Sequence, residues 1–289
     1  MRIRRLVCSM VTVLALAAPL ITEPLVASAR PDDDLRRGAV PAEPSFVELK
    51  AAGPDWYTPR LHQQVLAAAE GGRGVRLPEG VDYDTSGLAF TGIRPGAWII
   101  SPAGCTTNFV FGSASNYFIG TAGHCASVGD EVTIIAAPGV LMNIGTTVKS
   151  VNKGVGNDFA LIDVRPSMEQ HVNPSMAYFG GPTAAGSPRP GDVVEHAGHG
   201  LVIGTGGTPR AGVVVYRAGA RFAWAGAASP GDSGSAVRLA NGAAAGDLTH
   251  IVVGGEYLPG NVAGTTIGRM LAIAGRRLAT APDGPDPTS

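Results

Sequence analysis

Short β-rich runs, separated by glycine, proline, asparagine and aspartate, follow one another from Gly87 almost to the C-terminus. Many short strands joined by such turns are typical of an all-β sandwich or barrel. One run, residues 267–279, has helical spacing instead and predicts a C-terminal helix. The β-rich runs are AWIIS (97–101), NFVFGS (108–113), NYFIGTAG (116–123), EVTIIAA (131–137), GTTVKSV (145–151), DFALIDV (158–164), DVVEHAG (192–198), AGVVVYRAG (211–219), RFAWAG (221–226), SAVRLA (235–240) and THIVVGG (249–255).

A segment rich in proline and glycine, residues 166–190, separates these runs into two blocks. We expect it to divide two β modules, one over about residues 87–170 and one over about 188–266, each too small for a large core of its own. The alternative is a long surface loop inside one sheet system. The main domain is expected to span residues 87–279, and residues 280–289 form a tail.

The first 29 residues (1–29) have the layout of a secretory signal peptide. An arginine-rich start precedes an apolar run over residues 6–21, and a small-x-small sequence ends at Ala29. The alternative is a membrane anchor, but the run is short and Pro19 and Glu23 interrupt its far end. We therefore expect cleavage after Ala29, a secreted extracellular protein, and no membrane attachment after cleavage.

Residues 30–86 differ in composition from the β-rich region. They open with an acidic run, carry repeated prolines and show no strand alternation. One helical pattern lies between Pro59, which could open a helix, and Gly71, which would stop it. The segment is predicted to be a propeptide, assisting folding or inhibiting, or a loose N-terminal extension. The alternative is a disordered spacer.

Two cysteines, Cys105 and Cys125, remain once the signal peptide and its Cys8 are removed. An isolated pair in an oxidising compartment is expected to form a disulfide. Its closed loop of about 21 residues is worth on the order of 3 kcal/mol in the chain-entropy model. The alternatives are two free thiols or a metal pair; His124 is the one nearby ligand, so a metal is disfavoured.

The charge balance gives no electrostatic case for nucleic-acid binding. Lysine and arginine total 22 against 23 aspartates and glutamates, a formal net charge of −1. No metal or cofactor is expected either. His196 and His199 are three residues apart, but the intervening glycine and the strand context spoil a helical pair of ligands.

The turn-like stretch GDSGS, residues 231–235, contains Ser233. A serine hydroxyl is a weak nucleophile unless a base lies beside it and a third group orients that base. His124 ends a strongly apolar run and is a candidate base; Asp158 precedes another apolar run and could fix the tautomer of an imidazole. Each residue alone is more often a surface or turn residue. Their occurrence in the order His, Asp, Ser, each in a specific flanking sequence, favours a catalytic triad.

The chain here resembles the trypsin/chymotrypsin-like serine peptidases, over roughly residues 88–275. The resemblance implies two six-stranded antiparallel β-barrels with the catalytic site in the cleft between them. It also implies that Cys105 and Cys125 form the disulfide that braces the histidine loop. The matching motifs are TAGHC (121–125), NDFAL (157–161) and GDSGS (231–235).

By position, the resemblance makes Ser233 the nucleophile, His124 its general base and acid, and Asp158 the residue that orients His124. The backbone N–H groups of Gly231 and Ser233 would form the oxyanion hole. Glycine suits position 231, because the hole needs an unusual turn and a close approach of substrate.

Asp232 matches the aspartate that pins the oxyanion loop in this family. The chain has no IVGG-type start to supply a new N-terminus as its partner. Many bacterial relatives use an internal arginine instead, for which Arg94, Arg210 and Arg217 are candidates. The alternative is that Asp232 caps the loop through its own backbone.

The sequence departs from the family's usual GDSGGP, since Ser235 and Ala236 replace glycine and proline. SGS also occurs in the glutamyl endopeptidases of this superfamily, which use a histidine in the specificity pocket. His250 occupies a similar place and could pair with an acidic substrate side chain. The alternative is a histidine on the flank of a strand.

The base of the specificity pocket is expected about six residues before the serine, at Ala227, with Ala228 and Ser229 beside it. No aspartate stands there. A charged P1 side chain would be left desolvated and unpaired, so cleavage after arginine or lysine is disfavoured. A medium-sized apolar P1 residue is expected.

The predicted function is a secreted serine endopeptidase that acts on polypeptides through an acyl-enzyme and works as a monomer. A catalytically silent binding protein with the same fold is the alternative. An esterase of the α/β-hydrolase type is excluded because its elbow needs G-x-S-x-G, position 235 is serine, and its triad runs Ser, Asp, His.

Overall fold

The computed structural model describes residues 45–77, 91–200, 207–253 and 261–285. The predicted signal peptide lies outside these residues. All of the described residues belong to one compact unit. Within that described part, no helix is both long enough and apolar enough to span a bilayer.

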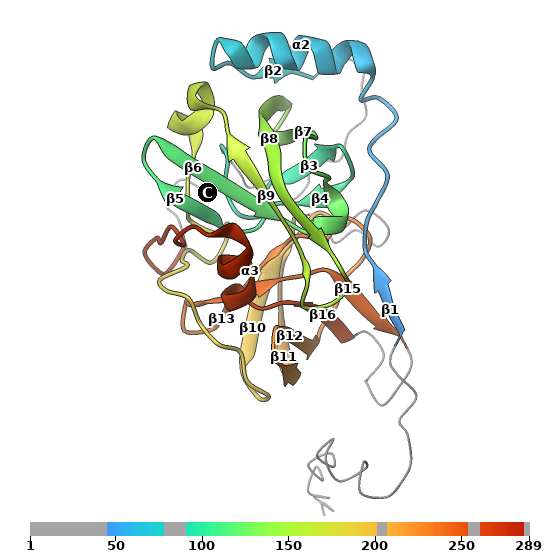
Figure 1. Ribbon diagram of the computed structural model, residues 1–289, viewed down its shortest axis with the longest axis vertical. Helices are drawn as coiled ribbons and strands as arrows, with labels where there is room; N and C mark the ends of the chain where they lie inside the picture. Colours follow the sequence, from blue (N-terminus) through green and yellow to red (C-terminus); the bar gives the residue numbers. More distant parts are fainter. Residues whose placement is uncertain (1–44, 78–90, 201–206, 254–260, 286–289) are drawn as a thin grey trace, which may run out of the picture. The chain divides into compact units, whose positions relative to one another are not determined.

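A first antiparallel sheet contains most of the strands expected in the first β block (Figure 1). Its strands are β2 (Val75–Arg76), β3 (Trp98–Ser101), β4 (Cys105–Thr106), β5 (Val110–Ser113), β6 (Asn116–Thr121), β7 (Glu131–Ala137), β8 (Val140–Asn152) and β9 (Asp158–Val164). They are ordered β4-β3-β7-β8-β9-β6-β5, and β2 pairs with β8. Strand β9, which is apolar apart from Asp158 and Asp163, is buried at every residue except Asp163, as a strand inside a curled sheet must be.

A second antiparallel sheet is formed by the strands that follow the 3-10 helix η2 (Pro166–His171), together with the N-terminal strand β1. Its strands are β1 (Ser45–Glu48), β10 (Val193–Ala197), β11 (Pro209–Ala218), β12 (Arg221–Ala225), β13 (Ala236–Leu239), β14 (Ala244–Asp247), β15 (His250–Val253) and β16 (Asn261–Thr265). Their order is β1-β15-β16-β12-β11-β10-β13-β14. The predicted fold class, all-β with two antiparallel barrels and a C-terminal helix, is therefore confirmed as two curled antiparallel sheets and a C-terminal helix. The described residues give eight strands to each sheet rather than six, in part because the N-terminal segment adds β1 and β2.

Residues 45–77, the described part of the N-terminal segment, pack against the rest of the described chain. The helix predicted from Pro59 is present as α2 (Pro59–Glu70), and its first turn is capped by the Thr58 hydroxyl, which accepts the Leu61 N–H at 3.2 Å. One face of α2, which includes Leu61 and Val65, is buried against β3, β7 and β8. The segment also contributes β1 and β2, which are too short to show strand alternation in the sequence. The propeptide assignment stays a prediction.

The C-terminal helix α3 (Ile267–Ala274) is shorter than the predicted 267–279. Gly275 stops it by adopting a left-handed φ of +63°, which lets its N–H bond to the Leu271 carbonyl. Beyond it, Asp283 of the predicted tail pairs with Arg238 at 2.5 Å.

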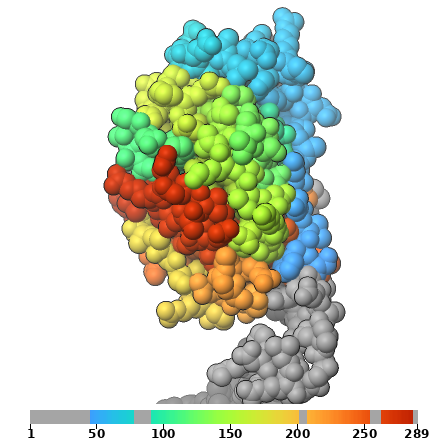
Figure 2. Space-filling view, in the orientation of Figure 1, coloured from blue at the N-terminus to red at the C-terminus, as the bar shows by residue number. Residues whose placement is uncertain are grey.

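Helix α3 joins the two sheets. Its buried residues share one apolar cluster with Phe159 of the first sheet and with Ala236 and Ala244 of the second. In Figure 2 the C-terminal segment covers the line where the two sheets meet. The strand ends near this junction are therefore held in fixed relative positions, which is what a site built from both sheets requires.

Candidate active site

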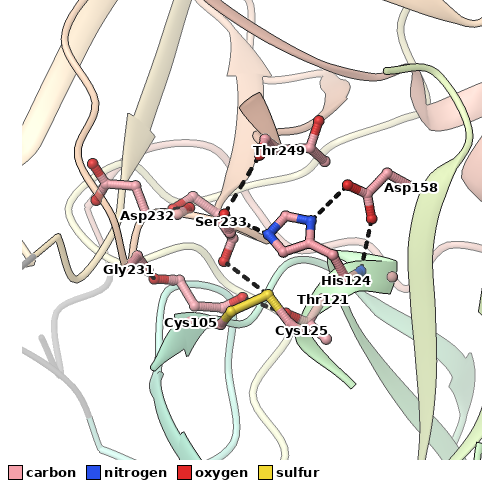
Figure 3. Close-up of a disulfide and its surroundings, with 12 residues drawn as sticks. Cys105, Thr121, His124, Cys125, Asp158, Gly231, Asp232, Ser233 and Thr249 are labelled. Atoms are coloured by element: carbon pink, nitrogen blue, oxygen red, sulfur yellow. Dashed lines mark hydrogen bonds and ion pairs between the residues drawn. A yellow bond between two sulfur atoms is a disulfide. The ribbon is translucent and has the colours of Figure 1, made fainter. Parts of the chain in front are cut away.

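His124, Asp158 and Ser233 come together in a buried site between the sheets (Figure 3). His124 lies on the 3-10 turn η1 (Gly123–Cys125) after β6, Asp158 begins β9, and Ser233 lies in the turn before β13. His124 Nδ1 is 2.6 Å from Asp158 Oδ2, and His124 Nε2 is 2.9 Å from Ser233 Oγ. A carboxylate, an imidazole and a hydroxyl in this sequence of contacts have the geometry that activates a serine.

Both oxygens of the Asp158 carboxylate orient His124. Oδ2 contacts the ring, and Oδ1 accepts the His124 backbone N–H at 2.9 Å. From the second sheet, the Thr265 hydroxyl donates to the Asp158 carbonyl at 3.2 Å and lies 3.3 Å from its backbone nitrogen. The imidazole therefore has one orientation and one tautomer available to it. No sequence pattern singled out Thr265.

The turn before Ser233 depends on glycine. Gly231 has a φ of +103°, and a side chain there would meet the His199 carbonyl oxygen at 2.3 Å. In this conformation the Gly231 N–H points into the site, where it donates to the Leu49 carbonyl at 2.6 Å. The predicted oxyanion donor is thus oriented to hold a carbonyl oxygen.

Arg210, on β11, is the partner of Asp232. Its two terminal nitrogens lie 2.7 and 2.8 Å from the two carboxylate oxygens, in the bidentate geometry of strong ion pairs. Both side chains are largely buried. Of the three candidate arginines, Arg94 instead donates to the Ser175 carbonyl. The ion pair fixes the residue between Gly231 and Ser233.

Thr106 ties this turn to the first sheet. Its backbone N–H donates to the Ser233 carbonyl at 2.8 Å, and its hydroxyl donates to the Gly231 carbonyl at 2.9 Å. The hydroxyl also accepts the His199 N–H at 3.0 Å. A threonine after a cysteine carries no recognisable signal in the sequence, so only the fold shows this role.

Cys105 and Cys125 are joined in a disulfide. It links β4 to the turn that carries His124, and Figure 3 shows it beside the triad. The two sulfurs and a His124 nitrogen lie close enough together to hold a metal ion. Because both sulfurs are used in the covalent bond, they cannot act as thiolate ligands.

The predicted specificity residues lie in two places, the Ala227–Ser229 stretch before the Ser233 turn and His250 on β15. Ala228 packs at the edge of the apolar core of the second sheet. The Ala227 carbonyl accepts from Arg210 at 3.2 Å, and the Ser229 N–H donates to Asp232 at 2.8 Å. These two contacts make the stretch part of the loop support. Its role in specificity stays a prediction.

His250 lies beside the triad. Its Nδ1 is 3.7 Å from Asp158 Oδ2 and 2.8 Å from the Thr249 hydroxyl. Burial lowers the pKa of His250, and the charge of Asp158 opposes that shift. Its ring also makes an edge contact with Phe46 of β1. These neighbours do not include the Ala227–Ser229 stretch, and a specificity role for His250 stays a prediction.

Two further buried groups near the site have shifted pKa values. Burial raises the pKa of Asp247 well above its ordinary value, and the nearby charge of Asp158 adds to the shift. Burial lowers the pKa of His196 to about 3, with a further contribution from Arg210. Burial therefore opposes the charged form of both groups.

The fold and the site define a chymotrypsin-like arrangement: two curled antiparallel sheets with histidine, aspartate and serine at their junction. No protein-family model matches the chain, and no curated protein matches its sequence. Solved structures do match. Protease A of Thermobifida fusca is 19% identical and covers 66% of this chain and 98% of its own, with a TM-score of 0.45.

Two other matches have similar coverage. The chymotrypsin of Cellulomonas bogoriensis is 20% identical over 66% of this chain and 99% of its own, with a TM-score of 0.45. A glutamic-acid-specific serine protease, described as using a histidine triad in substrate binding, is 16% identical over 65% of this chain and 100% of its own, with a TM-score of 0.48. These chains are similar to this one in fold.

Proposed function

We propose that the chain is a serine endopeptidase in which Ser233, His124 and Asp158 form the catalytic triad. The observation that carries the proposal is the buried series of contacts from Asp158 Oδ2 through both ring nitrogens of His124 to Ser233 Oγ, at 2.6 and 2.9 Å. A hydroxyl in this position can lose its proton to the imidazole as it attacks a carbonyl.

The steps follow from the positions of these atoms. Ser233 Oγ attacks the scissile carbonyl carbon while His124 Nε2 takes the hydroxyl proton, and Asp158 stabilises the imidazolium. His124 then gives this proton to the leaving amine, the C–N bond breaks, and an acyl ester remains on Ser233. Water hydrolyses the ester with His124 as base, which releases the acid and restores the serine.

The N–H groups of Gly231 and Ser233 are proposed to stabilise the oxyanion, and each such donor is worth about 3 kcal/mol in the transition state. The supporting observation is that Gly231 already donates to a carbonyl at 2.6 Å. The Arg210–Asp232 ion pair keeps the turn in this conformation.

We propose an apolar P1 preference, because the Ala227–Ser229 stretch offers no acidic side chain and Ala228 borders an apolar core. An acidic preference mediated by His250 is the alternative, since that imidazole lies beside the triad with its Nδ1 3.7 Å from Asp158 Oδ2. A peptide panel varied at P1 tests both. Strong cleavage after arginine or lysine would contradict the apolar proposal.

We also propose that the protein is secreted after loss of residues 1–29, carries no membrane attachment afterwards, acts on polypeptides and is monomeric. The signal-peptide layout of the sequence supports secretion. Immunoblots of culture medium and washed cells test localisation, and light scattering tests the monomer. Material that stays with the membrane fraction, or a dimer mass, would count against these points.

Reaction with a fluorophosphonate probe tests the catalytic assignment. The processed protein should be labelled at Ser233 and should hydrolyse casein, whereas Ser233→Ala should do neither while keeping its circular dichroism spectrum. A folded, processed protein that is neither labelled nor active would instead support a silent binding protein.

A further inference from the structure

The N-terminal strand β1 adds itself to the edge of the second sheet. It pairs antiparallel with β15, with Glu48 opposite His250 and Ser45 opposite Val253. Without β1, β15 would be the edge strand of this sheet. An exposed strand edge beside a catalytic serine is a site where an extended peptide can bind through main-chain hydrogen bonds.

The residue after β1 continues this pairing into the triad. The Leu49 N–H donates to the Thr249 carbonyl at 3.4 Å, and the Leu49 carbonyl accepts the Gly231 N–H at 2.6 Å. Thr249 also lies against the nucleophile, because the Ser233 hydroxyl is 3.5 Å from its carbonyl oxygen. The Leu49 carbonyl therefore occupies the position in which an oxyanion-hole donor polarises the bond to be cleaved.

The chain is held on the other side of the same bond as well. The Ala51 N–H donates to the Gly104 carbonyl at 3.1 Å, and the Gly104 N–H returns a bond to the Ala51 carbonyl at 2.9 Å. Gly104 immediately precedes β4, the edge strand of the first sheet. Residues 45–51 thus run from the edge of one sheet to the edge of the other, and these contacts put the Leu49–Lys50 bond beside the Ser233 turn. Figure 1 shows β1 beside β15 at the side of the second sheet.

One side chain of this segment is apolar and buried, and its neighbours are exposed. Leu49 is only 1% exposed and packs in the apolar core cluster that includes Val237 and Leu248, with Ala228 at its edge. Phe46, Val47 and Glu48 before it are exposed, as is Lys50 after it. A single buried apolar anchor in an otherwise exposed extended strand is what an apolar P1 pocket selects.

We propose that the Leu49–Lys50 peptide bond is a processing site that Ser233 hydrolyses within the same molecule. This inference rests on the proposed peptidase function. Ser233 Oγ bonds to the Leu49 carbonyl carbon, His124 carries the hydroxyl proton to the Lys50 nitrogen, and the C–N bond breaks. One water then releases Leu49 as a carboxylate and restores the serine hydroxyl.

Cleavage here divides the N-terminal segment. Lys50 becomes a new N-terminus that stays with the domain through the Ala51–Gly104 pairing and helix α2. Strand β1 and Leu49 then keep only their non-covalent contacts with the domain and can leave. Until it leaves, β1 occupies the edge of β15 and the Leu49 carbonyl occupies the Gly231 N–H, so other substrates are blocked and activity on an added peptide follows release of the segment.

Processing of the full chain tests the proposal. Wild-type protein followed by intact mass and N-terminal sequencing should acquire an N-terminus at Lys50, while Ser233→Ala should stay intact at this bond. The rate should be first order and unchanged over a 100-fold range of protein concentration. A wild-type protein that hydrolyses an added fluorogenic peptide but is not cut at Lys50 would overturn the processing site and leave the peptidase function standing. A protein that cuts neither would overturn both.

Substitutions in the segment separate recognition from folding. Leu49→Asp places a carboxylate in the apolar pocket and should slow self-cleavage by roughly 100-fold or more. The variant loses the favourable burial of the leucine side chain and must desolvate a charge, and both changes weaken binding of the segment. Val47→Asp adds the same charge on the same strand at a side chain that is 48% exposed, and should still be cut at Lys50. Equal rates for the two variants would overturn the assignment of Leu49 as the anchor.

A second variant, Lys50→Pro, tests the processing site if Leu49→Asp does not fold. Lys50→Pro alters an exposed residue and makes the scissile nitrogen a tertiary amide with a fixed φ, which leaves β1 and Leu49 as they are. This variant should fold, remain uncut and give less than about a hundredth of the wild-type hydrolysis of the added peptide. Cleavage of Lys50→Pro at position 50, or full activity without cleavage, would contradict the proposal.

Discussion

At the scale of single residues, the site depends on side chains that hold other side chains in place. Asp158 is the clearest case, since one carboxylate contacts both the ring and the backbone of His124. Its replacement would leave the nucleophile and the base present but would change the imidazole tautomer that faces Ser233.

Asp158→Asn should therefore lower kcat by about 10⁴-fold while the fold is retained, because asparagine presents an N–H where Nδ1–H needs an acceptor. Because a variant slowed this far would not process itself in the usual time, the comparison uses the first-order rate at which the Lys50 N-terminus appears in the full chain, with circular dichroism as the folding control. A loss of less than about tenfold would show that Asp158 does not set the orientation of His124.

Arg210 should matter through Asp232. Arg210→Met leaves a fully buried carboxylate without its bidentate partner, which typically costs about 3–5 kcal/mol of unfolding free energy. Urea denaturation measures the loss, and kcat should fall because the turn holding Gly231 is released. The double variant Arg210→Met with Asp232→Asn should recover a large part of the stability. If it is no more stable than Arg210→Met alone, the ion pair is not the cause.

The sequence predicted these residues unevenly, for a physical reason. His124, Asp158 and Ser233 each stand in flanking residues that the chemistry itself requires, such as the glycine at 231. Thr106, Thr265 and Leu49 act through contacts with residues far away in the chain, and a threonine or leucine has many ordinary uses. Arg210 is intermediate, since the need for an arginine was predicted but the choice among three depended on the register of β11.

At the scale of elements, strand β10 carries a buried histidine into the second sheet. The His196 ring makes an edge contact with Trp224 and is completely buried, and burial lowers its pKa to about 3. The unfolded chain, with an ordinary pKa near 6.5, therefore binds a proton that the folded chain does not bind between these values. The stability that this group contributes is present above pH 6.5 and is lost as the pH falls toward 3.

Unfolding free energy should accordingly decrease below pH 6.5, by up to about 1.4 kcal/mol per pH unit from this one group. His196→Leu keeps an apolar side chain against Trp224 and removes the proton uptake. Urea titrations at pH 4, 5 and 6 should give a shallower slope for the variant. Parallel slopes for the two proteins would show that His196 does not contribute to acid sensitivity.

Element boundaries followed from local signals only where those signals were strong. Helix α2 begins at Pro59 and ends before Gly71 as predicted, because both ends carry their own capping residues. Helix α3 ends earlier than its apolar pattern indicated, because Gly275 takes a left-handed conformation. Strands β1 and β2 have no local signal, since they exist through pairing with β15 and β8.

At the scale of the whole described unit, function depends on how the two sheets meet. His124 and Asp158 come from the first sheet, and Ser233 comes from the second. Helix α3 holds the sheets through apolar packing, while polar contacts at the site set the finer alignment. An error of about 1 Å at this junction would be enough to lower the rate about 100-fold.

Thr106 offers the sharpest test of this alignment, because its hydroxyl is bonded to the Gly231 carbonyl across the junction. Thr106→Val should lower the free energy of unfolding by about 1–3 kcal/mol, because buried partners are left unsatisfied, and should lower kcat about 10–100-fold by shifting the oxyanion turn.

Thr147→Val is a matched control for Thr106→Val. Thr147 is equally buried, and within the described chain its hydroxyl has no hydrogen-bond partner. Its replacement should be neutral or slightly stabilising and should leave kcat unchanged. Equal effects of the two variants on stability and on kcat would show that the alignment of the sheets comes from apolar packing alone.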